Sequence, residues 1–282
     1  MYRKMTIKIV GLVLFAALLH AVWNAILRSG EDPLWNVTVK SFATTISAGV
    51  CALFLPIPLQ DCWGYLIVSS ALQVGCSIFL AYAYKSGQLW QVYPVVRGSI
   101  PLLVTIGGIL FMKQYPSMFS FLGVLLIVSG IASLIYGRGG SSTQSFLFAV
   151  VAGLFVASYV SIDSIGVRLA GNALSYAVWM FLIYGVMTPV VFIGLRRKPI
   201  TNVLSSEAFK AMSGGVVSLT GYTAFTVALS LGPVGPISAL RETSIVFSVI
   251  ISWLFLSETP TIPRILSSVV VSIGAAFVAL KL

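Results

Sequence analysis

Ten long hydrophobic stretches divide this chain, and they constrain its fold more than any other feature. Each approaches the ~20 apolar residues that a helix needs to cross the hydrocarbon core of a bilayer. They lie at residues 7–27, 35–55, 64–84, 91–112, 119–137, 145–167, 173–195, 210–231, 234–256 and 262–280. The run 12–19 is continuously apolar and 245–256 is broken only by Ser248 and Ser252, without the alternation of a membrane strand. Because only helices then satisfy every backbone polar group, the sequence predicts an all-α membrane protein with ten transmembrane helices.

The composition excludes several other classes of protein. Only 9% of the residues are charged and 58% are hydrophobic, whereas soluble domains carry roughly 25% charged residues. The net charge of +10 is scattered over the connectors, which indicates contact with anionic lipid headgroups rather than nucleic acid. The three cysteines form no CxxC motif, no phosphate-binding loop is present, and the single histidine leaves no catalytic grouping. We therefore expect a monomer or homodimer in the lipid bilayer that uses no cofactor or metal and is not an enzyme.

The ten stretches form two copies of a five-segment unit. Similar residues recur 144 positions apart, at Arg97 and Arg241, Leu110-Phe111 and Leu254-Phe255, Pro116 and Pro260, and Gly130 and Gly274. Because five is odd, the second copy must enter the membrane upside down. The sequence therefore predicts inverted repeats at residues 1–137 and 145–282. Many secondary transporters use such repeats to open one midplane site to either side, so transport is the function that the repeat favours.

Three segments resemble EamA-type members of the drug/metabolite transporter superfamily. They are His20-Ala-Val-Trp23-Asn24-Ala25 with Asp32-Pro33, then Pro94-Val-Val-Arg97-Gly98-Ser-Ile-Pro101, and finally Leu256-Ser-Glu258-Thr-Pro260. The resemblance covers essentially the whole chain. It implies two inverted five-helix repeats and the movement of metabolites such as amino acids across the bacterial inner membrane, often outward. It also implies cytoplasmic termini, an orientation that the count of basic loop residues does not decide.

One departure from the family pattern concerns an acidic residue after the fourth helix. Members of the family commonly carry Gly-Glu there, whereas this chain has Lys113-Gln114. The second copy keeps the acid, in Ser257-Glu258. If this glutamate caps or gates its half of the protein, only the second half retains that device.

Charged residues within the predicted spans are the first candidates for a binding site. A charge at the centre of a span costs at least about 2.5 to 3.5 kcal/mol on insertion scales, so it usually faces a cavity or a partner. Five ionisable residues qualify, namely Lys40, Arg97, Asp163, Arg241 and Glu242. The excess of cations over acids among them mildly favours an anionic or zwitterionic cargo.

Arg97 is the leading candidate for a substrate-binding group. It lies between Pro94 and Pro101, and prolines that free backbone carbonyls favour a bend beside a water-filled cavity. Its guanidinium can clasp a carboxylate or phosphate with two hydrogen bonds. The alternative is an arginine that satisfies the carbonyls freed by the prolines.

The two acids among these five leave more than one interpretation open. Glu242 either binds an ammonium group or exchanges a proton, or it forms a structural or gating ion pair with Arg97 or Lys40. Its neighbour Arg241 points about 100° away on a helix, so it pairs with another acid or snorkels. Asp163 lies near the end of the sixth span, as a helix-end group or as a second proton-coupling or gating residue.

Polar and aromatic residues complete the list of candidates. His20, Trp23 and Asn24 share one face of the first helix, as ligands or as interhelical hydrogen-bonding groups. Lys40 belongs to a polar stripe with Asn36 and Thr44, although its long stem can snorkel. Rings that either contact the substrate or anchor the membrane interface are Tyr82, Trp90, Tyr93, Tyr159, Trp179 and Tyr222. Trp90 and Tyr93 rank first, since they precede Arg97 by two turns and one turn.

Together these patterns predict a secondary active transporter that works by alternating access. Its cargo is a small polar or zwitterionic metabolite, amino-acid-like or an organic anion, exported or exchanged across the inner membrane. A proton gradient or a counter-substrate supplies the energy. The alternative is a flippase for a lipid-linked or lysolipid substrate, which requires a cavity that opens laterally to lipid.

Overall fold

The computed structural model of this chain describes residues 6–112, 117–136, 142–196, 203–231, 237 and 240–280. Within these ranges every regular element is a helix, which confirms the all-α prediction. The departure at Lys113-Gln114 and the repeat position Pro116 lie outside the described residues.

Each predicted stretch is occupied by a helix over most of its described residues. The helices are α1 (Ile7–Arg28), α2 (Pro33–Ala52), α3 (Trp63–Ser86) after a short 3-10 helix η1 (Gln60–Cys62), α4 (Leu89–Met112), α5 (Met118–Tyr136), α6 (Thr143–Leu169), α7 (Ala173–Arg196), α8 (Ser206–Leu231), α10 (Ser244–Phe255) and α11 (Ile262–Leu280). The ninth stretch, expected from residue 234, is interrupted: Ile237, Leu240 and Arg241 are helical, a turn follows at residues 242–243, and α10 begins at Ser244. Thr243 N donates a hydrogen bond to Leu240 O across this turn.

Within the described ranges, five helices are long and apolar enough to cross a membrane by length and composition. They cover Ile7–Arg28, Gln60–Ser86, Thr143–Leu169, Ala173–Leu195 and Ser206–Leu231. Shorter apolar segments occupy Phe121–Ser133, Ser244–Phe255 and Ile265–Val278. In α2 the hydropathy is lowered by a buried polar stripe that includes Asn36, Lys40 and Thr44. The helices are placed as expected, whereas the count of ten membrane crossings stays a prediction.

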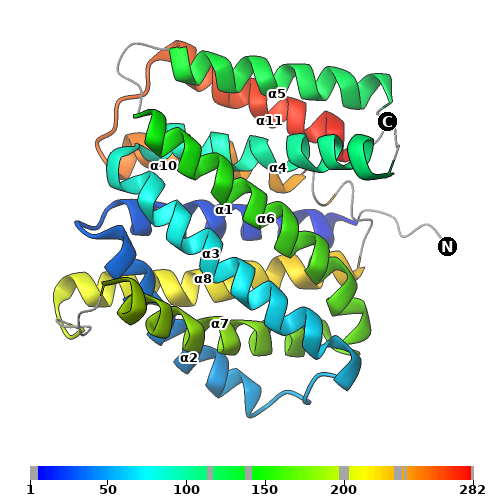
Figure 1. Ribbon diagram of the computed structural model, residues 1–282, viewed down its shortest axis with the longest axis vertical. Helices are drawn as coiled ribbons and strands as arrows, with labels where there is room; N and C mark the ends of the chain where they lie inside the picture. Colours follow the sequence, from blue (N-terminus) through cyan, green and yellow to red (C-terminus); the bar gives the residue numbers. More distant parts are fainter. Residues whose placement is uncertain are drawn as a thin grey trace.

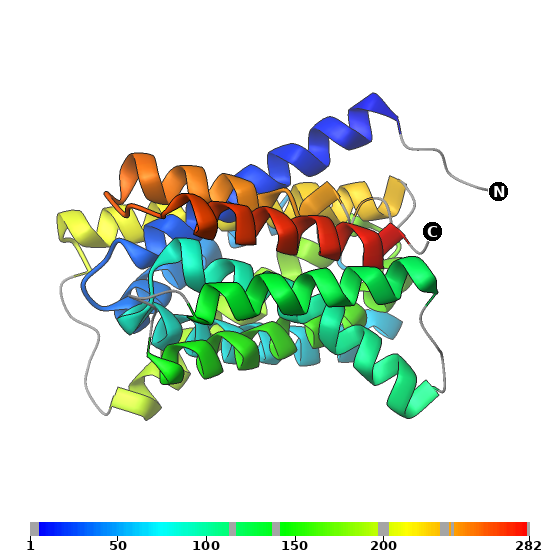
Figure 2. The ribbon, with the colours of Figure 1, turned by 90° about the horizontal axis from the view of Figure 1, so that it is seen from above.

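The two halves of the chain are interleaved. The most extensive helix pairs are α3 with α6, α5 with α11, α1 with α8 and α2 with α7, and each joins a first-half helix to a second-half helix. Figure 1 shows α5 and α11 at one edge of the bundle, α2 and α7 at the opposite edge, and α1, α3 and α6 between them. α1 begins and α11 ends at the same end of the bundle (Figures 1 and 2).

Burial follows the pattern of a protein that faces lipid. Large apolar side chains are exposed on the outer surface, among them Val186, Val190, Trp253 and Phe255. Arg97, Arg241 and Glu242 are buried together with polar residues of α2. An apolar exterior this extensive is unusual for a soluble monomer and fits a bilayer, while the charges gather inside.

Candidate functional site

A buried ion pair lies at the centre of the candidate site. Arg97, on α4, donates from Nη2 to Glu242 Oε1 at 2.6 Å, and its side chain is 3% exposed. Glu242 lies in the turn just before α10 begins. The structure therefore places these two side chains in the ion pair that the sequence left as one alternative. Among the described residues Arg97 Nε and Glu242 Oε2 have no hydrogen-bond partner, so the pair is only partly satisfied there.

Arg241 lies next to this pair but has a different partner. Its guanidinium carbon lies 3.8 Å from the ring centroid of Phe225, on α8. It forms no salt bridge within the described residues. Arg97 and Arg241 are close enough to interact electrostatically. A cation over an aromatic face is stabilised by the ring quadrupole, and this contact takes the place of the acid or the snorkelling that we expected.

A chain of rings and polar groups links α2 to α1 and α4. Lys40 Nζ lies 3.9 Å from the ring centroid of Trp23 and 5.6 Å from that of Tyr184. Trp23 Nε1 donates to His20 Nδ1 at 3.1 Å, and the His20 ring lies 5.9 Å from that of Tyr93. Lys40 is buried and has no carboxylate partner in the described part of the chain. The centre therefore holds a cation without a counter-charge.

Asn24 is occupied by helix packing. Its Nδ2 donates to His20 O at 2.8 Å, and its Oδ1 accepts from the Tyr84 hydroxyl at 2.9 Å. These bonds fix α1 against α3, the interhelical role that was one of its two interpretations. Tyr84 was not a predicted site residue, because nothing in the sequence distinguishes it from the other aromatic residues of the helices.

A second buried carboxylate, Asp163 on α6, forms a separate cluster. The Tyr176 hydroxyl of α7 donates to Oδ1 at 2.7 Å, and the Tyr222 hydroxyl of α8 donates to Oδ2. The side chain is 5% exposed, so it faces the helix interior despite its place near the end of α6. The Tyr222 ring also packs 6.4 Å from Phe225, the residue beneath Arg241. Tyr176 was missed, since thirteen residues of sequence separate it from Asp163.

The remaining predicted aromatic residues divide by location. Tyr93 and Tyr159 are buried, and Tyr93 is the one in ring contact with His20. Trp90 is buried and donates from Nε1 to Gln88 Oε1 at 2.5 Å. Tyr82 packs against Phe148, with ring centroids 5.5 Å apart. Trp179 packs against Trp63, with ring centroids 5.3 Å apart. The structure therefore brings Tyr93 to the centre but gives Tyr82 and Trp179 packing partners elsewhere.

Glu258, the acid retained in the second repeat, joins three elements at one end of the bundle. Its Oε2 and Oε1 accept from Leu89 N, the first residue of α4, at 3.0 and 3.2 Å. Its Oε1 also lies 3.3 Å from Arg28 Nε at the end of α1. Burial raises the pKa of this carboxyl above its ordinary value. A carboxylate at a helix N-terminus is stabilised by the free amide groups, so Glu258 caps α4.

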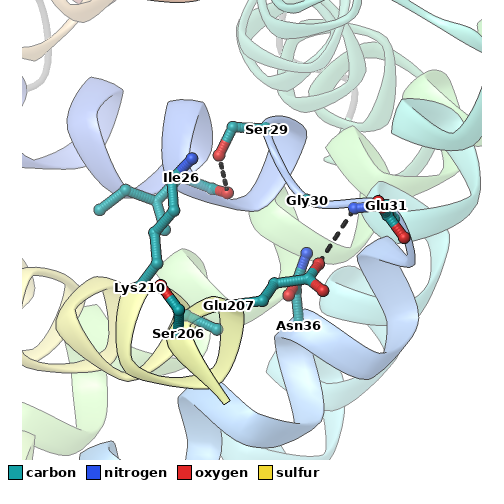
Figure 3. A pocket seen from close by; sticks show the side chains of 9 residues that line it. Ile26, Ser29, Gly30, Glu31, Asn36, Ser206, Glu207 and Lys210 are labelled. Atoms are coloured by element: carbon teal, nitrogen blue, oxygen red, sulfur yellow. Dashed lines mark hydrogen bonds between the residues drawn. The ribbon is translucent and has the colours of Figure 1, made fainter.

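A pocket opens near the end of α1, between the starts of α2 and α8 (Figure 3). Its volume is about 330 Å³, and its polar lining comes from Ser29, Glu31, Asn36, Ser206, Glu207 and Lys210. A small void lined by Trp23, Asn36 and Lys40 continues from it toward the centre. Of the pocket residues, only Asn36 belonged to a pattern noted in the sequence, the polar stripe of α2.

Comparisons with known proteins identify relatives of this chain. Residues 143–280 match the EamA-like transporter family. The chain is 22% identical over 210 residues to the human (Homo sapiens) protein Solute carrier family 35 member G1. That match covers 70% of this chain, which spans 57% of the relative's length.

A solved crystal structure shares the fold, with a TM-score of 0.66 and 16% sequence identity. The superposition covers 95% of this chain and 98% of that one. At this identity the likeness establishes the fold alone. Together with the family match and the apolar helices, it identifies a multi-pass membrane protein. Over residues 143–280 the chain is therefore similar to the EamA-like transporter family of the drug/metabolite transporter superfamily.

Proposed function

We propose that the protein is a secondary active transporter that moves a small polar or zwitterionic metabolite by alternating access. It exports or exchanges this cargo across the bacterial inner membrane, with both termini in the cytoplasm. The observation that carries the proposal is the buried, partly satisfied pair of Arg97 and Glu242, with Lys40 unpaired nearby. Buried charges in membrane helices mark substrate and ion pathways, because the fold retains them at a cost.

The packing of helices supports two inverted repeats, at residues 1–137 and 145–282. If α1 to α5 correspond in order to α6, α7, α8, α10 and α11, contacts occur in matching sets. α3 packs on α6 as α8 packs on α1, and α4 packs on α6 as α10 packs on α1. The corresponding helices α2 and α7, and α5 and α11, pack on each other. This reciprocity is what a twofold relation between the halves predicts.

Close backbone contacts between α5 and α11 repeat the same relation. A Cβ on Gly123 would lie 2.6 Å from Gly274 O, and a Cβ on Gly274 would lie 2.6 Å from Gly123 O. A Cβ on Gly130 would lie 3.0 Å from Ser267 O. The 144-residue offset maps position 123 onto 267 and position 130 onto 274. The contact between 123 and 274 therefore corresponds to the contact between 130 and 267. Small residues at such crossings let membrane helices approach closely.

The ion pair joins α4 of the first half to the start of α10 in the second, which makes it a switch between conformations. An amino-acid-like cargo carries a carboxylate for Arg97 and an ammonium for Glu242, so it satisfies both groups after they separate. The unpaired Arg97 Nε and Glu242 Oε2 offer the first contacts. The cations Arg241 and Lys40 add further attraction for the carboxylate. Binding then releases α4 from α10, which permits the change of access.

Asp163 is the proposed proton-coupling residue. Its carboxylate lies apart from the ion pair and is held by neutral tyrosine hydroxyls, so a proton can be gained without separating a salt bridge. The Tyr222 ring connects this cluster to Phe225 and hence to Arg241. Protonation of Asp163 therefore changes the charge around Arg241 and biases one conformation.

The test is transport into proteoliposomes that contain the purified protein, against a panel of radiolabelled amino acids and organic acids. We expect Arg97→Ala and Glu242→Gln to abolish transport of any cargo that the wild type moves. Arg168→Ala is the matched control, because Arg168 is an exposed arginine at the end of α6. Wild-type rates in both Arg97→Ala and Glu242→Gln would refute this site. Transbilayer movement of a fluorescent lysolipid without metabolite transport would favour the flippase.

A further inference from the structure

The polar pocket near Asn36 lies away from the central ion pair. It opens where α1 ends, and Figure 1 shows that α1 begins and α11 ends at the other end of the bundle. Its volume of about 330 Å³ is at the lower end of the range for small-molecule pockets, roughly 300 to 1,000 Å³. The pocket is therefore large enough for a molecule of amino-acid size.

Asn36 is the feature of this pocket that indicates a ligand. Its side chain is 3% exposed, lines both the pocket and the void beside it, and finds no hydrogen-bond partner at Oδ1 or Nδ2 in the described part of the chain. Gly30 packs directly against the carboxamide, and a Cβ at that position would clash with it. A buried amide without partners is costly, because it has lost its water without a replacement. A ligand that both accepts and donates hydrogen bonds would satisfy it.

Charges of both signs surround the mouth of the pocket. Glu207 and Lys210 extend from α8, Lys210 toward the end of α1 and Glu207 toward Glu31 (Figure 3). Glu207 Oε1 accepts from Glu31 N at 3.1 Å, which holds this carboxylate in place and leaves Oε2 for another donor. Lys210 and Glu31 are exposed, so the mouth is wet. An ammonium group is attracted to the two glutamates and a carboxylate to Lys210.

A second cation lies deeper on the same face of α2. Lys40 follows Asn36 by four residues, which places the two side chains one turn apart on one face of the helix. A small void beside the pocket shares Asn36 with it and is also lined by Lys40 and Trp23, whose ring lies 3.9 Å from Lys40 Nζ. The attraction for a carboxylate therefore continues from the mouth to the central cluster.

We infer that the pocket between α1, α2 and α8 is a peripheral binding site for a zwitterionic ligand of amino-acid size. Asn36 hydrogen-bonds the ligand, Glu207 holds its ammonium group, and the carboxylate lies between Lys210 and Lys40. The inference rests on the proposed function in one respect, since we take the ligand to be the cargo on its path to or from Arg97. Binding here does not itself require transport.

Binding to the purified protein in detergent micelles tests the inference by calorimetry. The probes are the twenty L-amino acids, each alone, followed by the methyl ester and the N-acetyl derivative of every one that binds. We expect at least one amino acid to bind, and both derivatives to bind at least tenfold more weakly. Asn36→Ala should raise the dissociation constant about tenfold and Lys210→Ala about threefold, since exposed charges contribute less.

Lys85→Ala is the matched control for charge. Lys85 is an exposed lysine at the end of α3, outside the pocket, and its loss should leave the dissociation constant within twofold of the wild type. Asn36→Leu separates binding from folding. It replaces an unpartnered amide by an apolar side chain of similar size, so it should weaken binding while keeping or raising the thermal midpoint.

Three results would overturn the inference. They are the absence of binding by all twenty amino acids, derivatives that bind as tightly as the parent, and wild-type affinity in both Asn36→Ala and Lys210→Ala. The proposed function is judged separately in proteoliposomes. If Asn36→Ala and Lys210→Ala bind amino acids with normal affinity while Arg97→Ala loses transport, the peripheral binding site is refuted and the proposed transporter is not. Amino-acid binding that depends on Asn36, without transport by the wild type, refutes the transporter alone.

Discussion

The two buried carboxylates of the helical core, Glu242 and Asp163, are satisfied in different ways. Glu242 forms an ion pair with Arg97 from the other half of the chain and leaves Oε2 without a partner. Both oxygens of Asp163 accept from tyrosine hydroxyls of its own half, Tyr176 and Tyr222. Glu242 thus joins the two halves of the chain, whereas Asp163 is enclosed by helices of one half. This contrast separates a candidate switch from a candidate proton site.

The largest effect should come from breaking the ion pair at one partner. Arg97→Ala leaves Glu242 buried without a counter-charge, which costs about 3 to 5 kcal/mol of unfolding free energy. Denaturant unfolding in micelles and proteoliposome transport measure the two consequences, lost stability and lost transport.

A double variant sharpens this first prediction. In Arg97→Met combined with Glu242→Leu both charges are replaced by apolar side chains, so stability should return while transport does not. A double variant as unstable as Arg97→Ala would show that packing rather than charge dominates at this position.

The next largest effect concerns energy coupling rather than stability. Asp163→Asn keeps the size of the side chain but removes the exchangeable proton, so it should abolish accumulation driven by a pH gradient. Exchange of labelled for unlabelled cargo, which needs no net proton movement, should continue near the wild-type rate. The two assays in the same vesicles measure this difference. Gradient-driven accumulation by the variant would exclude Asp163 as the coupling residue.

Removing one tyrosine hydroxyl from Asp163 should have a moderate effect. Tyr222→Phe and Tyr176→Phe each delete a hydrogen bond to a buried carboxylate, and each should lower the unfolding free energy by about 1.5 to 3 kcal/mol. Thermal unfolding in micelles measures the loss. Tyr65→Phe is a control, because Tyr65 donates no side-chain hydrogen bond to Asp163. If both cluster variants match this control, the hydroxyls do not stabilise the acid.

The smallest effect is expected at the bundle end, where Glu258 pairs with the 32% exposed Arg28. Glu258→Gln keeps an acceptor for Leu89 N and loses only a partly solvated ion pair, which contributes less than about 1 kcal/mol. Because burial raises the pKa of Glu258, the folded state binds a proton more tightly than the unfolded chain. This group therefore lowers stability as the pH rises through the raised pKa, and Glu258→Gln should remove that dependence. Unfolding measured across the acidic range would contradict this if the two proteins responded identically.

The sequence predicted the helices well and their starting points less well. Stretches such as 145–167 and 210–231 correspond to α6 and α8, because hydropathy is a local property of roughly twenty residues. The interruption of the ninth stretch at residues 242–243 was not predicted, since the hydropathy pattern continues across that turn. Predicting that turn requires knowing that Glu242 faces Arg97.

The candidate site was predictable as a set of residue types and not as a set of contacts. Buried ionisable residues stand out in apolar helices, so Arg97, Lys40 and Asp163 were all identified. Their partners were not, because 145 positions separate Arg97 from Glu242 and sequence spacing carries no information at that range. Tyr176 and Tyr84 look like ordinary interface aromatics until the helices are packed.

By itself, the sequence determined the helical class, the residue ranges of most helices and the charges that a membrane interior must accommodate. These follow from local hydropathy and from the cost of burying charge in lipid. Only the tertiary structure decided that Glu242 pairs with Arg97, that two tyrosines enclose Asp163, and that Asn36 lines a pocket. These contacts depend on how each helix is rotated about its own axis. That rotation is determined by packing against all neighbouring helices together, which the local sequence does not encode.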